Sequence, residues 1–261
     1  MSQVSPLYTQ SRRLLYTGML MMICIFSFAQ MQQTRRYEID QKDSDEYFSI
    51  ISLEDDGLAL LRERDKYEGN KKLWELILLD TALAEKKKIE FYLEERFPMI
   101  GYDVTPGQLY LLYRTGDTNK NSFHLLEFDT REGAQEGSFE IKPEVEFKVT
   151  HFSKVGSRLA FGGYVSKDPA VILFDPSNKS IKIVPGFFQK DNELVDLRVN
   201  QNKTFNVTLI DRSQRAERKL VFRTFDETGK LLLEDIVPID DEKSLQTSIS
   251  SQLKREDLIV A

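Results

Sequence analysis

Two histidines, His124 and His151, are the natural starting points for acid–base or nucleophilic chemistry in this chain. A Ser-His-Asp triad would have to use one of them, yet no Gly-x-Ser-x-Gly turn is present. A zinc site needs three or four ligands, which two histidines do not supply. Phosphate-loop and dinucleotide-binding motifs are also missing from the sequence. We therefore predict no catalytic, cofactor-binding or metal-binding residues, and no cofactor.

Four residues remain as candidates for a site at the mouth of a central channel: His151, Asp196, Arg198 and Asp103. Asp196 and Arg198 are two residues apart, so they share one face of a predicted strand. There they either grip a ligand or form a local ion pair, which is the commoner outcome. Asp103 and Asp196 are the carboxylates that a hydrolase of the glycosidase kind would need about 5 to 10 Å apart. Whether these four side chains can form a site depends on the strands in which they lie.

Four other aspartates mark those elements, because each ends an apolar run. They are Asp80, Asp129, Asp175 and Asp226, at intervals of 49, 46 and 51 residues. An aspartate in this place can accept a hydrogen bond from the backbone two residues on, which closes an Asx-turn. We interpret the four as turn residues that record a repeat.

Alignment on these aspartates predicts four strands in each repeat. The third strand ends at the aspartate, and the fourth is a short apolar triplet that follows the turn. Four short antiparallel strands in about 40 to 50 residues are typical of a β-propeller blade. The predicted strands are, unit by unit, Tyr47–Ser52, Leu58–Leu61, Leu76–Leu79 and Ile89–Phe91; Pro98–Tyr102, Leu109–Leu112, Leu125–Phe128 and Phe139–Ile141; Val149–Phe152, Leu159–Phe161, Val171–Phe174 and Ile181–Ile183; Leu194–Val199, Phe205–Leu209, Phe222–Phe225 and Leu231–Leu233.

One segment, Lys71–Leu93, favours a helix by composition, since it is rich in Leu, Glu, Ala and Lys. The register with the other repeats predicts instead two strands joined by a loop at Thr81–Lys87. We therefore predict two strands in this segment rather than a helix.

The number of repeats is not whole. Full repeats are predicted at about 45–96, 97–146, 147–193 and 194–244, with a partial fifth at 245–261 that contains strands at Leu245–Ser250 and Leu258–Val260. Tyr37–Ile39 matches the fourth-strand triplet and would complete a fifth blade, as propellers often close their ring. Alternatively, and we favour this, the sequence is the front part of a larger propeller.

The first 29 residues have the three parts of a secretory signal peptide. Arg12 and Arg13 precede an apolar stretch of 16 residues, Leu14–Ala29, which ends in a small-x-small cleavage site before Gln30. An uncleaved membrane anchor is the alternative, but the stretch is shorter than the ~20 apolar residues that span a bilayer. Cys24 follows Ile23 rather than a small residue, so it does not indicate lipid attachment.

The amino-acid composition limits the cellular compartments and the classes of partner that fit this chain. Without the leader the chain has no cysteine, and it has 34 basic against 42 acidic residues, a net charge of −8. Nucleic acid is excluded as a partner, because the one dense basic run, Lys86–Lys88, fits a solvated hairpin tip. The absence of disulfides fits a bacterial periplasm or cell surface.

Two second strands and the turns before them carry a family resemblance. The segments Asp56–Leu60 and Gly156–Phe161, each followed by a third strand that ends in Asp, resemble the blades of TolB-like β-propellers of bacterial envelopes. The resemblance covers roughly residues 45–261 and is one of pattern; of the usual Pro-Asp-Gly opening, Asp55–Gly57 keeps only a part. It implies a propeller that binds proteins or stands beside an enzymatic domain, and it transfers no active site.

The sequence thus predicts an all-β, secreted or periplasmic propeller that acts as a binding module for a protein or another envelope component. One alternative is a propeller-type hydrolase or lyase that acts on glycans or peptides. The other is a signal-anchored envelope propeller, which would contact the membrane only through an uncleaved leader.

Overall fold

The computed structural model describes residues 35–115, 122–187, 191–214, 217–239, 248–250 and 258–260. The chain divides into two units, Met1–Ile39 and Asp40–Ala261, and every strand among the described residues lies in the second. Within the described part of the chain, no helix is both long and apolar enough to cross a membrane. The predicted signal segment lies outside the described residues.

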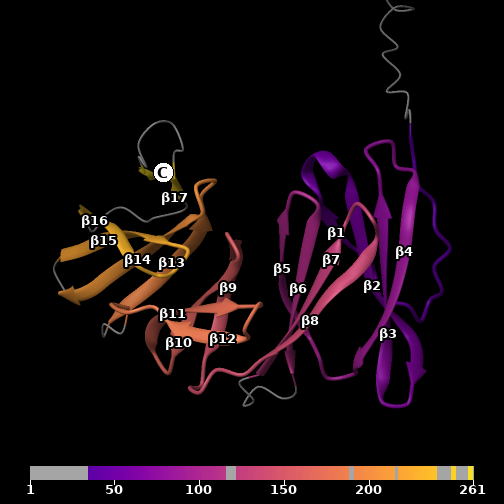
Figure 1. Cartoon of the computed structure of the whole chain (residues 1–261), viewed down its shortest axis with the longest axis horizontal. Coiled ribbons are helices and arrows are strands. Elements are labelled where there is room, and N and C mark those ends of the chain that lie inside the picture. The colour runs from indigo at the N-terminus through magenta and orange to yellow at the C-terminus, as the bar shows by residue number, and fades with distance from the viewer. Residues whose placement is uncertain are drawn as a thin grey trace, which may run out of the picture. The chain divides into compact units, whose positions relative to one another are not determined.

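Four antiparallel sheets of four strands each follow one another along the second unit (Figure 1), and in each sheet the strands neighbour one another in chain order. This is the β-propeller class that the repeat predicts, with every one of the sixteen expected strands in place. The sheets consist of β1 (Ser49–Ser52), β2 (Leu58–Glu68), β3 (Lys71–Leu79) and β4 (Glu85–Glu94); β5 (Met99–Thr105), β6 (Gln108–Thr115), β7 (Ser122–Asp129) and β8 (Ala134–Ile141); β9 (Lys148–Val155), β10 (Arg158–Val165), β11 (Asp168–Asp175) and β12 (Ser180–Ile183); β13 (Asn192–Val199), β14 (Thr204–Gln214), β15 (Glu217–Asp226) and β16 (Leu231–Ile239).

The partial fifth repeat contains two short paired strands, β17 (Ser248–Ser250) and β18 (Leu258–Val260). The expectation of a strand at Tyr37–Ile39 is wrong, since these residues have no regular secondary structure. The triplet has the alternation of a fourth strand, but alternation alone does not supply the neighbouring strand with which it would have to pair.

Three apolar cores lie between successive sheets, and strand β6 shows how one sheet serves two of them. Leu109, Leu111 and Tyr113 lie in the core shared with the first sheet. Tyr110 and Leu112, which alternate with them, lie in the core shared with the third sheet. Because successive side chains of a strand point to opposite faces, a continuous apolar run is what a sheet covered on both faces requires.

The four register aspartates close the turns between third and fourth strands, as predicted. Oδ1 of each accepts a hydrogen bond from the backbone N–H two residues on: Ala82 for Asp80 (2.7 Å), Arg131 for Asp129 (2.7 Å), Ser177 for Asp175 (3.1 Å) and Thr228 for Asp226 (2.8 Å). In Asp80, Asp129 and Asp226 the same oxygen accepts a second backbone N–H. One short side chain therefore satisfies several turn amides that would otherwise lack a partner.

The segment with helical composition, Lys71–Leu93, forms the strands β3 and β4 and the turn between them. Leu76 and Leu78 pack in the core with the second sheet, where Trp74 stacks on Phe91 and meets Tyr113 edge to face. Burial of these side chains between two sheets outweighs the modest helix propensity of the sequence.

A cluster of charged side chains is buried on the first sheet. Arg62 and Glu75 lie opposite each other on β2 and β3, and Arg62 Nε donates to Glu75 Oε2 at 2.6 Å. Arg64 and Lys88 bind the other carboxylate oxygen of Glu75. Asp45 adds a second carboxylate, 3.0 Å from Arg64 Nε. The cluster ties the segment that precedes β1 to the first sheet.

Candidate functional site

Three of the predicted channel-mouth residues lie on adjacent first strands. His151 is on β9, and Asp196 and Arg198 are on β13, which contacts β9. Thr150 Oγ1 and His151 Nδ1 are 2.9 Å apart. Burial lowers the pKa of His151, although the negative charge of Asp196 acts in the opposite direction. The imidazole is therefore neutral around pH 7 and close enough to Asp196 to sense its charge.

Asp196 and Arg198 form the local ion pair that was one of their two expected roles. Arg198 Nε donates to Asp196 Oδ2 at 2.6 Å, and the guanidinium is nearly half exposed. The Asp196 side chain is less exposed, at 19%, and a partly exposed pair of this kind contributes little to stability.

Asp103, the fourth candidate, is engaged elsewhere. It lies on β5, and its carboxylate accepts hydrogen bonds from Lys154 N (2.6 Å) and Ser153 Oγ (3.2 Å) on β9. Burial raises its pKa, against the effect of these hydrogen bonds. The structure gives Asp103 and Asp196 separate partners, so each carboxylate has a local structural task.

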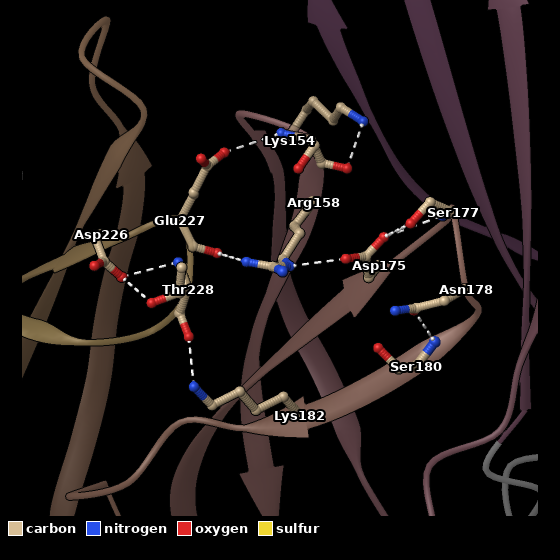
Figure 2. Close-up of polar contacts among 11 residues, drawn as sticks. Lys154, Arg158, Asp175, Ser177, Asn178, Ser180, Lys182, Asp226, Glu227 and Thr228 are labelled. Carbon is tan, nitrogen blue, oxygen red and sulfur yellow. Dashed lines mark hydrogen bonds and ion pairs between the residues drawn. The ribbon is translucent and has the colours of Figure 1, made fainter.

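The turn-bearing edge of the third and fourth sheets carries a polar network (Figure 2). Arg158 donates to Asp175 Oδ2 and to the Glu227 carbonyl, both at 3.1 Å. Glu227 Oε2 accepts from the Ser157 backbone N–H, and Lys182 Nζ donates to the Thr228 carbonyl at 2.6 Å. Lys86 Nζ makes a similar but longer contact, 3.5 Å, from the first sheet to the Thr130 carbonyl of the second. These charges hold successive sheets together.

A cleft of about 720 Å³ lies between the first and second sheets. Both charge signs, four hydroxyls, a histidine and the rings of Tyr92 and Phe97 line it. Its lining residues are Lys71, Tyr92, Leu93, Glu94, Phe97, Thr115, Ser122, His124, Ser138, Glu140 and Lys142. The lining is mainly polar and charged, with Leu93 and the rings of Tyr92 and Phe97 as its apolar part, and such convergent polar groups can fix the orientation of a ligand.

His124 is the central titratable group of the cleft. Its Nε2 is 3.1 Å from Ser138 Oγ, and its ring is 5.9 Å from that of Phe97. Burial lowers the pKa of His124, against the negative charges of Glu140 and Glu94. A neutral imidazole that contacts a hydroxyl can donate or accept a hydrogen bond, which suits it to a polar, uncharged group of a ligand.

The two lysines of the cleft differ in whether a carboxylate neutralises their charge. Lys142 Nζ binds Glu140 Oε1 at 2.7 Å. Lys71 lies opposite Glu94 in the register of β3 and β4, and among the described residues it has no ion pair within 4.0 Å. A ligand that enters here meets one available ammonium group beside an aromatic wall.

Sequence reasoning missed this cleft because it weighed His151 above His124. The missed signal is a polar residue in a mainly apolar strand that faces a charged residue across the hairpin: His124 of β7 is paired with Glu140 of β8. Such a signal becomes useful only once the register of the hairpin is known.

Comparisons with known proteins concern the fold. No family model matches the sequence, and no curated protein matches it. One similar solved structure is prolyl oligopeptidase B from Galerina marginata, bound to a 35mer hydrolysis and macrocyclization substrate. It matches with a TM-score of 0.50 and 13% identity, over 83% of this chain and 30% of that one. The Dos1 propeller matches with a TM-score of 0.46 and 13% identity, over 78% of this chain and 51% of that one. The chain thus spans about half or less of the length of these structures, and at such identity the likeness concerns the fold alone.

Proposed function

We propose that this protein is an exported β-propeller of the TolB-like kind that binds a protein or another envelope component. The observation that carries the proposal is the cleft between the first and second sheets. Its walls are strands of two packed sheets, so the binding groups are held in place before a ligand arrives, which reduces the entropy lost on binding. Its mixed lining suits a polar surface or peptide with an acidic group for Lys71.

A capture experiment tests the proposal. The chain from Gln30 onward, immobilised, is exposed to an envelope extract, beside Lys71→Glu/Lys142→Glu and the matched surface variant Lys148→Glu/Lys167→Glu. We expect a partner that the wild type and the surface variant retain and the cleft variant loses. If no variant retains a partner, the binding function is wrong; if the cleft variant retains it equally, the site is wrong.

One observation favours an enzyme as the second candidate. Ser138 Oγ lies within hydrogen-bond distance of His124 Nε2 inside the cleft, as a serine nucleophile lies beside its base. This pair, rather than Asp103 and Asp196, would carry a hydrolase function. Labelling with a fluorophosphonate probe separates the two candidates: a label on Ser138 that is absent from Ser138→Ala supports the hydrolase, and an unlabelled protein supports the binding module.

A further inference from the structure

Strand β16 differs from the outer strands of the other three sheets. It is an edge strand of nine residues, and eight of them are exposed. Five of those eight are large and apolar: Leu231 (46%), Leu232 (52%), Leu233 (49%), Ile236 (51%) and Val237 (40%). The exposed residues of β4 and β8 are mainly charged or polar instead. The sequence predicts a short apolar fourth strand at Leu231–Leu233, and the structure shows all three side chains exposed in β16.

Apolar side chains of β16 project on both faces of its sheet. Ile236 and Leu231 lie opposite Val221 and Phe225, on the side of the third sheet. Val237 and Leu233 lie opposite Leu220 and Thr224, on the other side. An added strand would therefore find apolar neighbours on either face. Proteins usually protect such an edge with charges, prolines or a cover, because its unpaired backbone groups can pair with another chain.

The two acidic residues of β16 differ in their partners. Glu234 Oε2 is bound by Arg223 Nε at 2.6 Å. The Asp235 carboxylate accepts a hydrogen bond only from the neighbouring Ile236 N–H, and among the described residues no cation pairs with it. The centre of the apolar edge thus carries one negative charge that is not neutralised.

We propose that β16 is a docking edge for an extended segment of a different protein, in which apolar residues alternate with polar ones and a lysine or arginine faces Asp235. Backbone hydrogen bonds would add this segment as a fifth strand, and the apolar and basic side chains would give specificity. Pro238 lacks an N–H, so the paired stretch ends before it. The edge is separate from the cleft residues, and the proposal adds a second contact surface to the proposed binding function.

A second copy of the same chain fits this edge poorly. Two antiparallel β16 strands in full overlap would place Asp235 opposite Asp235. A shift by one residue would place Glu234 opposite Asp235, and a shift by two would place Glu234 opposite Glu234. Like charges directly opposite each other destabilise a strand pair. The charge of the edge therefore favours a basic segment over self-pairing.

Two fluorescein-labelled peptides test the proposal by anisotropy with the full chain: Thr-Val-Thr-Val-Lys-Val-Thr-Val-Thr and the same peptide with Glu in place of Lys. We expect the lysine peptide to bind up to about fivefold tighter, since one charged cross-strand pair is worth up to about 1 kcal/mol. Asp235→Lys should reverse the preference. Glu136→Lys, which makes the same change on the outer strand β8, should leave it unaltered.

Three outcomes would overturn the proposal. The first is equal affinity of the protein for both peptides, and the second is no binding of either peptide. The third is a concentration-dependent dimer in sedimentation velocity that Leu233→Lys abolishes, because this would assign the edge to a second copy of the chain. Lys71→Glu/Lys142→Glu should bind the lysine peptide like the wild type. Failure of the cleft and failure of the edge are therefore distinguishable.

Discussion

Arg62 and Glu75 form a hydrogen-bonded ion pair of 2.6 Å across β2 and β3, with side chains only 2% and 0% exposed. Loss of one partner leaves the other charge buried without full compensation, which costs about 3 to 5 kcal/mol. We therefore expect Glu75→Gln to lower the free energy of unfolding by about 3 kcal/mol. Urea titration followed by the fluorescence of Trp74, the only tryptophan, measures this. Glu90→Gln, on the same face but exposed, is the matched control, and an equal effect of both variants would contradict the prediction.

The same carboxylate should make stability depend on pH. Burial alone raises the pKa of Glu75, but hydrogen bonds from Lys88 and Arg62, with their positive charges, lower it below its usual value of 4.5. A folded pKa below the unfolded one means that the stabilisation is present above about pH 4.5 and is lost as the pH falls through the folded pKa. The stability difference between wild type and Glu75→Gln should shrink in that range. Urea titrations at several pH values check it, and a constant difference down to about pH 3 would speak against the ion pair.

Gly57, in the turn between β1 and β2, should not tolerate a side chain. Its φ is +114°, and a Cβ there would lie 2.1 Å from the Leu79 carbonyl oxygen. Gly69 also has a positive φ, +63°, but a Cβ there would meet open space. We expect Gly69→Ala to cost about 1 kcal/mol and Gly57→Ala at least two to three times as much. Thermal unfolding of the two variants tests this, and similar costs would show that the turn relaxes freely.

Asp226 should act through its oxygen acceptor and not through its charge. Oδ1 accepts hydrogen bonds from Thr228 N (2.8 Å) and Lys230 N (2.9 Å). Asparagine keeps this acceptor, whereas alanine removes it. We expect Asp226→Ala to cost about 1 to 2 kcal/mol and Asp226→Asn less than half of that. Chemical denaturation of both variants decides, and equal losses would assign the role to the charge.

The leader should be removed on export. Expression of the full sequence in cells that secrete it, followed by N-terminal sequencing, should give Gln30 as the first residue. Ala29→Leu should slow or block cleavage, because signal peptidase sites require a small residue there. An intact N-terminus on an exported, membrane-bound wild-type protein would support the signal-anchored alternative.

The repeat could be predicted from sequence because each unit closes the turn after its third strand with an aspartate at the same position. Asp80 and its three counterparts must close a turn after a buried strand, and the turn needs an acceptor at a fixed place. Strand positions then follow from one alignment. The misassigned Tyr37–Ile39 shows the limit: a triplet has the right alternation, but pairing depends on residues far away in the sequence.

The cleft and the exposed edge could not be predicted in this way. His124 and Lys71 become neighbours of one cavity only when two sheets pack. Leu231–Leu233 has the composition of a buried strand, and nothing local shows that these side chains are exposed. Glu75, within an apolar run, gives no sign of its cationic partners until β2 and β4 flank it.

Strand β6 contributes alternate side chains to two cores, so neither core can loosen without disturbing the other. Unfolding is therefore cooperative between neighbouring sheets, because a strand that packs in two cores couples the stability of both. In native-state hydrogen exchange, the amides of β6 and β10 should open only with the whole unit, whereas those of β4 and β16, each at the outer edge of a single sheet, should open first.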